Sequence, residues 1–195
     1  MTMGNREALL AGALACIYEK GYARTTARDV ATAAGTSLAA IGYHFGTTQE
    51  LLNQAVYATV ERWGDEMQER IKAGASPDRG YLDRLTAIID DTIGSIRDDR
   101  PVWESTLDML AQIKHVPEIH AMLRTGIHQA RTGNVAMFDA VDEDTVDAHQ
   151  ERTLGAFYYC LIIGLVVQWL IDPDTAPRGE DIAEALRTIA AKVDR

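Results

Sequence analysis

Residues 36–50 read TSLAAIGYHFGTTQE and carry the pattern that decides the fold of this chain. Ile41 and Phe45 stand four positions apart, so they share one face of a helix. Most other positions of the stretch hold small side chains, and Tyr43 and His44 follow side by side near its end. The stretch therefore predicts a short helix, from residue 36 or 37 to residue 44 or 45, whose outer face lacks bulk.

Two further helices are expected upstream of this one. Thr26 and Asp29 have the spacing of a capping box, in which each side chain satisfies the backbone N–H of the other residue. They predict a helix over residues 26–34 that Gly35 closes, behind a supporting helix over residues 5–20. Two short helices joined by a glycine-containing turn form a helix-turn-helix, whose second helix enters the major groove of DNA.

The outer face of this motif predicts contacts with a DNA duplex. Hydroxyl and N–H groups at helix N-termini bind phosphates, and slender side chains in the first turn of the second helix reach base edges, including thymine methyl groups. Taken singly, the threonines are helix caps first, the Tyr–His pair fits a surface helix end, and Arg28 is as often solvated as bound to DNA. The candidate residues are Thr26, Arg28, Thr36, Ser37, Leu38, Ala39, Gly42, Tyr43, His44, Thr47 and Thr48.

The distribution of charge is compatible with this interpretation. The chain has a formal net charge of −10, which argues against DNA because Lys and Arg supply most phosphate affinity. Residues 1–50, however, hold four basic and four acidic residues, so the whole deficit lies in residues 51–195. The N-terminal segment alone is suited to approach a polyanion, and its few cations predict modest DNA affinity with a shallow salt dependence.

The rest of the chain reads as helical, which makes the fold class all-α with about nine helices. Nearly every segment shows the 3.6-residue period and none shows sustained alternation. A second capping box starts at Thr47, and one apolar stripe then continues to about residue 71. We expect a DNA-binding domain over residues 1–46 and an effector-binding and dimerisation domain over residues 47–195. In the helix that opens at Pro117, Gly126 and Gly133 lower the helix propensity, so the sequence leaves open whether this helix is continuous.

One later helix is unusually apolar. Residues 154–171 read LGAFYYCLIIGLVVQWLI, which is just long enough to span a bilayer. Gln168, two glycines and acidic flanking residues favour a helix covered on both sides in a soluble protein, and a membrane-associated protein stays the alternative. Cys16 and Cys160 lie in apolar helical patterns, so we expect buried free thiols and a reducing cytoplasm.

At the N-terminal residues this chain resembles the TetR family of bacterial repressors. The resemblance covers about residues 6–56, and it implies a homodimer, a ligand cavity in the C-terminal body and release from DNA when an effector binds. Two positions depart from the family pattern: Gly42 stands where Tyr or Asn is common, and Thr48 where a phosphate-contacting Lys is common. The matching positions are Thr25-Thr26, Asp29-Val30-Ala31, Ala33-Ala34-Gly35, Ile41, Tyr43-His44-Phe45-Gly46 and Glu50-Leu51-Leu52.

Candidates for the effector cavity are large apolar residues of the C-terminal body. Each one alone is more often a core residue, but Trp and Met together favour an adaptable apolar pocket. Glu104 and Asp108, four apart on one helix face, would receive a cationic ligand or belong to a solvated face. The cavity candidates are Trp63, Met67, Trp103, Leu107, Leu110, Met122, Phe138 and Tyr158.

These features predict a ligand-responsive transcriptional regulator. We expect a cytoplasmic repressor, without catalysis, metal or cofactor, that a small apolar or amphipathic effector releases from a palindromic operator; activation instead of repression stays open. The homodimer would form a four-helix interface through residues 147–171 and 179–194. A small helical enzyme is the rival class, but no nucleophile elbow, phosphate loop or paired metal spacing is present in the sequence.

Overall fold

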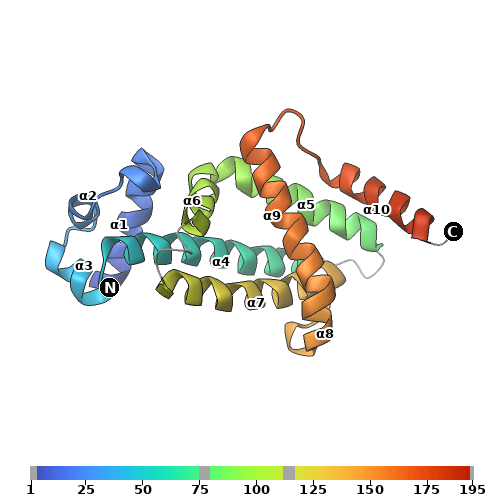
Figure 1. Ribbon diagram of the computed structural model, residues 1–195, viewed down its shortest axis with the longest axis horizontal. Helices are drawn as coiled ribbons and strands as arrows, with labels where there is room; N and C mark the ends of the chain where they lie inside the picture. The colour runs from blue at the N-terminus through green and yellow to red at the C-terminus, as the bar shows by residue number, and fades with distance from the viewer. Residues whose placement is uncertain (1–3, 75–79, 112–116, 194–195) are drawn as a thin grey trace. The chain divides into compact units, whose positions relative to one another are not determined.

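The computed structural model describes residues 4–74, 80–111 and 117–193, except for the side chains of residues 67, 68, 70–74, 109, 111 and 117–119 (Figure 1). Every regular element in these ranges is helical, as the periodicity predicted. In chain order they are α1 (Asn5–Lys20), the 3-10 turn η1 (Tyr22–Arg24), α2 (Ala27–Ala33), α3 (Leu38–Phe45), α4 (Thr48–Gly74), α5 (Tyr81–Asp98), α6 (Arg100–Ala111), α7 (Pro117–Asp139), the 3-10 turn η2 (Glu143–Thr145), α8 (Ala148–Gln150), the π-helical turn η3 (Glu151–Gly155), α9 (Ala156–Ile171) and α10 (Gly179–Val193).

The chain divides into two compact units. The first comprises Met1–Trp63 and Pro101–Leu123, and the second comprises Gly64–Arg100 and Arg124–Arg195. Helix α4 contributes to both of them, because its apolar stripe runs on past the helix-turn-helix. The functional division into residues 1–46 and 47–195 stays a prediction.

The core of the first unit joins α1, α2, α3 and the first half of α4. Helix α1 crosses α2 at Gly12, where an added Cβ would lie 2.9 Å from the backbone nitrogen of Ala34 and 3.1 Å from the carbonyl oxygen of Val30. Only a residue without a side chain permits this approach. The buried core residues are Leu9, Ala13, Cys16, Ile17, Tyr22, Val30, Ala31, Ile41, Phe45, Leu51, Leu52, Ala55, Val56 and Val102.

In the second unit, α5 packs against both α9 and α10 (Figure 1). Helix α5 buries five apolar residues at helical spacing, which are Leu85, Ile88, Ile89, Ile93 and Ile96. The ring of Phe138 on α7 stacks on that of Tyr158 on α9, with centroids 4.3 Å apart and planes at 9°. Arg84 Nε donates a hydrogen bond of 2.8 Å to the carbonyl of Phe138.

Helix α7 is continuous from Pro117 to Asp139, which answers the question that Gly126 and Gly133 left open. Each helical glycine costs about 1 kcal/mol relative to alanine, but tertiary packing overrides that local preference. The packing is visible at the C-terminal end of α7, where Val135 and Phe138 are fully buried.

The cysteine prediction was half right. Both thiols are free, and Cys16 is buried in the first core, where burial raises the pKa of its thiol. Cys160 is exposed, because it lies opposite the face of α9 that packs inward through Tyr158, Ile162 and Leu165. Composition alone could not distinguish the two faces of so apolar a helix.

The apolar helix is covered on one side within the single chain, although cover on both sides was expected. Phe157 and Ile171 are 46% and 78% exposed, while Leu165 and Trp169 are buried. In the described part of the chain, Ala148–Ile171 is the one helical stretch long and apolar enough to cross a membrane, with a mean hydropathy of 2.0. The core helix of a soluble protein meets the same two conditions.

Candidate nucleic-acid interface

Two glycines shape the helix-turn-helix. Gly35 follows α2 with φ +63°, and Gly46 follows α3 with φ +75°, a left-handed conformation that costs residues with a Cβ energy. Ser37 then lies in extended backbone as the N-cap of α3. The expected order of helix, glycine turn and second helix is confirmed.

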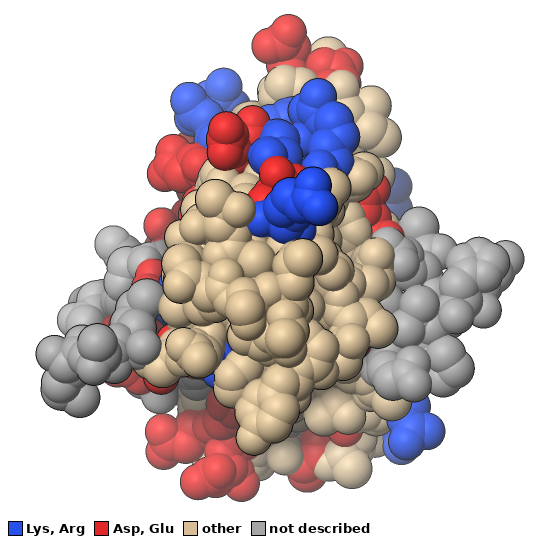
Figure 2. All heavy atoms as spheres, turned by 90° about the vertical axis from the view of Figure 1, so that its left-hand side faces the viewer, with Lys and Arg blue, Asp and Glu red and all other residues tan. Residues whose placement is uncertain are grey.

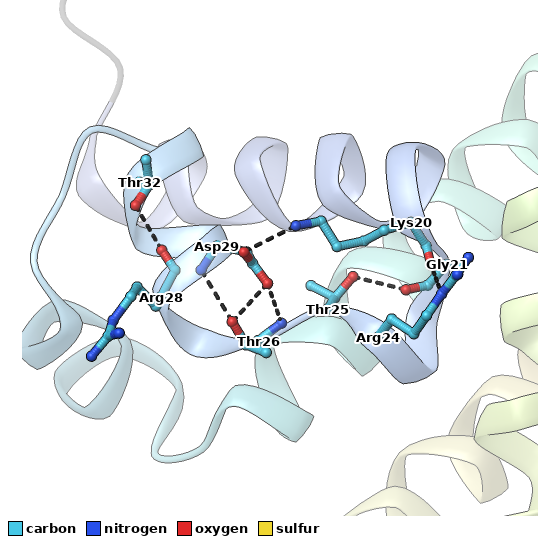
Figure 3. A network of polar contacts seen from close by, with 8 residues as sticks. All are labelled: Lys20, Gly21, Arg24, Thr25, Thr26, Arg28, Asp29 and Thr32. Atoms are coloured by element: carbon cyan, nitrogen blue, oxygen red, sulfur yellow. Dashed lines mark hydrogen bonds and ion pairs between the residues drawn. The ribbon is translucent and has the colours of Figure 1, made fainter.

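The N-terminus of α2 is held by a network of polar contacts (Figure 3). Asp29 N donates to Thr26 Oγ1 at 3.3 Å, and Thr26 N donates to Asp29 Oδ2 at 2.9 Å, so the predicted capping box is confirmed. Lys20 Nζ, at the end of α1, lies 2.9 Å from Asp29 Oδ1. The network ties the end of α1 to the first turn of α2.

This network makes a prediction about acid stability. The Thr26 and Lys20 hydrogen bonds lower the pKa of Asp29 to about 2, below its usual value of about 3.9. A carboxylate with a depressed folded-state pKa stabilises the fold above its unfolded pKa, and that contribution is lost as the pH falls from about 4 to about 2. Asp29→Asn should therefore lower the thermal midpoint at pH 7, and the difference from the wild type should shrink as the pH falls toward about 2. An equal difference at both pH values would contradict the role of the charge.

Helix α3 has one buried and one bare face, as its spacing predicted. Ile41 and Phe45 are buried, whereas Leu38 is 50% and Tyr43 85% exposed. The rings of Tyr43 and His44 meet edge to face, with centroids 4.9 Å apart. Figure 2 shows a broad uncharged area on the side where α2 and α3 lie, with Lys and Arg gathered along one border of it.

The predicted DNA-contacting residues differ in accessibility. Thr36 is half-buried, and its hydroxyl oxygen is buried without a hydrogen-bond partner in the described residues, so it does not point out with the others. His44 and Thr48 are also half-buried. The exposed members are Thr26, Arg28, Ser37, Leu38, Ala39, Gly42, Tyr43 and Thr47.

The cations near this surface are engaged to different degrees. Arg6 donates 2.8 Å to Gln54 Oε1 and lies over the Phe45 ring, and Arg24 Nε donates 2.7 Å to the carbonyl of Lys20. Arg28 has no side-chain hydrogen bond or ion pair with the described residues, and it extends away from the network in Figure 3. The Arg28 guanidinium is therefore available to bind a phosphate.

The start of α4 lies near the start of α2. Thr47 Oγ1 accepts a hydrogen bond of 3.0 Å from Glu50 N, which confirms Thr47 as a helix cap. An open hollow of about 480 Å³ separates the two helix N-termini. It is lined by Tyr22, Ala23, Thr25, Thr26, Ala27, Thr48, Gln49, Leu52 and Asp108.

Sequence reasoning missed a buried polar cluster that joins η1 to α4. The Tyr22 hydroxyl donates to Asn53 Oδ1 and accepts from Gln49 Nε2, while Asn53 Nδ2 has no partner in the described residues. Burial, with the charges of Asp108 and Glu50, raises the pKa of Tyr22. The i, i+4 spacing of Gln49 and Asn53 was the available signal, but it does not reveal which residue lies opposite.

Four of the eight effector candidates form two aromatic pairs, one in each unit. In the first unit, Trp63 and Trp103 meet edge to face at 5.1 Å, and the Trp63 indole nitrogen is buried without a partner in the described residues. Leu107, Leu110 and Met122 of that unit are half-buried. In the second unit, the Tyr158 hydroxyl of the Phe138–Tyr158 stack donates 2.7 Å to Asp139. The side chain of Met67 lies outside the described residues.

Comparison with known families decides what this fold is used for. Residues 9–55 match the family described as bacterial regulatory proteins, tetR family, and residues 82–194 match the C-terminal family of the BetI-type transcriptional repressor. The second match alone spans more than half of the chain. This chain belongs to the TetR family. It is therefore a helix-turn-helix regulator of transcription that binds DNA, and the resemblance seen over residues 6–56 is confirmed.

Individual relatives agree with the TetR assignment. The HTH-type transcriptional regulator PksA of Bacillus subtilis is 25% identical over 158 residues, covering 80% of this chain and 74% of PksA. The HTH-type transcriptional regulator CymR of Pseudomonas putida is 30% identical over 123 residues, which cover 63% of this chain and 58% of CymR.

Solved structures support the TetR fold. A regulator from Streptomyces coelicolor has a TM-score of 0.67 at 22% identity and covers 95% of this chain and 97% of its own. A regulator from Saccharomonospora viridis, solved in complex with choline, has a TM-score of 0.63 at 22% identity. The match covers 94% of this chain and 93% of that regulator.

Proposed function

We propose that this TetR-family protein is a cytoplasmic homodimeric repressor, without catalytic activity, that leaves a palindromic operator when a small effector binds. The observation that carries the proposal is the outer face of α3, where the small residues Ala39 and Gly42 are exposed beside Leu38 and Tyr43. Ile41 and Phe45 attach α3 to the core, so the opposite, exposed face of α3 has no structural purpose of its own. Close approach to base edges supplies one.

The roles of the candidate residues follow from their places. Leu38 and Ala39, in the first exposed turn of α3, are assigned to base edges, and Tyr43 with His44 at its far end to backbone phosphates. Thr26 and Thr48 lie at the starts of α2 and α4, whose free N–H groups favour phosphate oxygens. Arg28 supplies an exposed cation from α2.

Dimer formation is proposed through α9 and α10, the segments predicted at residues 147–171 and 179–194. Phe157 and Ile171 on α9, and Ile189 and Val193 on α10, are large exposed apolar side chains. A second copy that covers them would complete a four-helix interface and remove that surface from water. Sedimentation at micromolar concentration should give the dimer mass; a stable monomer would contradict this arrangement.

The effector is proposed to be small and apolar or amphipathic. The Trp63–Trp103 pair supports this class, because it combines apolar ring surface with a buried indole N–H that has no hydrogen-bond partner among the described residues. A choline-bound relative makes amphipathic cations one class to test first. Release requires that the effector bind the DNA-incompetent arrangement more tightly than the DNA-bound one.

Selection of bound fragments from random duplex DNA tests the proposal most directly. A recovered palindrome with half-sites about 34 Å apart would support both the reading helix and the two-fold symmetry. A preparation that enriches no sequence would contradict operator recognition. Reporter expression in a deletion strain then distinguishes repression, which we expect, from activation.

One substitution examines the reading surface itself. Tyr43→Ala should weaken operator binding about 30- to 150-fold, because each dimer loses two hydrogen bonds to charged oxygens, each contributing about 1–1.5 kcal/mol. The thermal midpoint should not change, since the side chain is 85% exposed. Tyr43→Phe keeps the ring and removes only the hydroxyl, so it should show most of the same loss. Unchanged affinity in both variants would remove Tyr43 from the interface.

A further inference from the structure

Helix α6 presents a carboxylate to the DNA-binding helices. Asp108 is exposed and lines the 480 Å³ hollow together with Thr26 of α2 and Thr48 of α4. It also lines a second, smaller hollow of about 160 Å³, with Glu104 and Arg24. The acidic pair at i, i+4 on α6 is therefore neither a remote surface feature nor part of the proposed reading face.

Among the described residues that line the larger hollow, Asp108 is the one acidic or basic side chain. The other lining groups are hydroxyls, an amide, a phenol and apolar side chains from η1, α2 and α4. The starts of α2 and α4 direct their N–H groups and positive dipole ends to their own N-terminal sides, where an anion is stabilised. The carboxylate of Asp108 thus lines the same hollow as the starts of the two helices to which phosphate contacts are assigned.

Asp108 is exposed and forms no direct polar contact with the described residues. In the part of the chain that the structure describes, its carboxylate makes no hydrogen bond and no ion pair. Its field reaches the hollow, because it adds to burial in raising the pKa of Tyr22. A free carboxylate in this position has an electrostatic effect and little structural one.

We propose that Asp108 weakens DNA binding by repelling the backbone phosphate held near the starts of α2 and α4. The inference rests on the phosphate contacts assigned to Thr26 and Thr48 above. Helix α6 also carries Trp103, Leu107 and Leu110, which are candidates for the effector site. A ligand that packs against them and shifts α6 would change the separation between carboxylate and phosphate.

The test uses the full-length protein and a duplex of arbitrary sequence, because phosphate contacts are independent of sequence. Asp108→Asn should bind a duplex of about 30 base pairs about three- to tenfold more tightly than the wild type at about 50 mM salt, with a smaller gain at about 200 mM. Asp108→Glu keeps the negative charge and should bind the duplex as tightly as the wild type. Asp108→Lys reverses the charge and should bind more tightly than Asp108→Asn.

The matched control is Glu61→Gln, which changes the net charge by the same amount. Glu61 is exposed on α4, about 20 Å along the helix from Thr48, which is well beyond the Debye length of about 10 Å at 0.1 M salt. The affinity of Glu61→Gln for the same duplex should stay within about 1.5-fold of the wild-type affinity. If Asp108→Asn and Glu61→Gln behave alike while the wild type binds, the inference about Asp108 is overturned and the proposed function stands. If the wild type binds no duplex even at low salt, both fail together.

Discussion

Gly12→Ala should lower the thermal midpoint of this protein and weaken DNA binding at least about tenfold. The new Cβ would lie 2.9 Å from the backbone nitrogen and 3.0 Å from the Cβ of Ala34, so α1 and α2 must move apart. Overpacking of this kind costs about 1–3 kcal/mol, or about 2–12 °C in a chain of this length. Binding should fall because α2 and α3 are held by α1 in the geometry that reads DNA.

Gly42→Ala is the matched stability control. It lies in α3 of the same unit, and an added Cβ there would meet nothing within 4 Å. Because alanine favours a helix by about 1 kcal/mol over glycine, this variant should melt at a higher temperature than the wild type. Calorimetry that found equal shifts in both variants would show that helix propensity, and not the contact of α1 with α2, decides the effect at Gly12.

Gly155→Ala should give the larger loss of stability. At this position in η3 an added Cβ would lie 2.6 Å from the carbonyl oxygen and 3.1 Å from the Cβ of Arg131 on α7. Backbone cannot yield as the end of a flexible side chain can, so we expect a cost of about 3 kcal/mol or more. The π-helical turn and the Phe138–Tyr158 stack should be disturbed together, since both join α7 to the α8–α9 segment.

Gly164→Ala provides the comparison within the same apolar helix. A Cβ at Gly164 meets nothing within 4 Å of the single chain. Its thermal midpoint should equal or exceed that of the wild type at protein concentrations where the protein is monomeric. A loss confined to high concentration would instead place Gly164 in the proposed dimer interface. Near-UV circular dichroism of Gly155→Ala should show the changed environment of Tyr158; an unchanged spectrum and midpoint would contradict the close approach.

Local signals sufficed for much of this fold. Thr26 with Asp29 predicts a helix start wherever the chain lies, because both partners of the capping box are within one turn. Ile41 and Phe45 likewise predict the buried face of α3 from spacing alone, and their burial leaves Tyr43 outside. The family pattern over residues 6–56 is composed of such local features, which is why it is legible in the sequence.

Other features depend on which segments meet. The exposure of Cys160, the continuity of α7 through Gly126 and Gly133, and the pairing of Tyr22 with Asn53 follow from contacts between residues far apart in the chain. No periodicity contains that information.

The sequence by itself determined most of the helices, the caps at Thr26 and Thr47 and the exposed face of α3, because those depend on neighbours within about one helical turn. Only the tertiary structure decided that Gly12 and Gly155 lie against the backbone of another helix, and that Asp108 of α6 borders the starts of α2 and α4. The physical reason is the distance in sequence between the residues that interact. Capping and amphipathic spacing act along a single helix, whereas close packing and the field of a lone carboxylate act between helices that only the folded chain brings together.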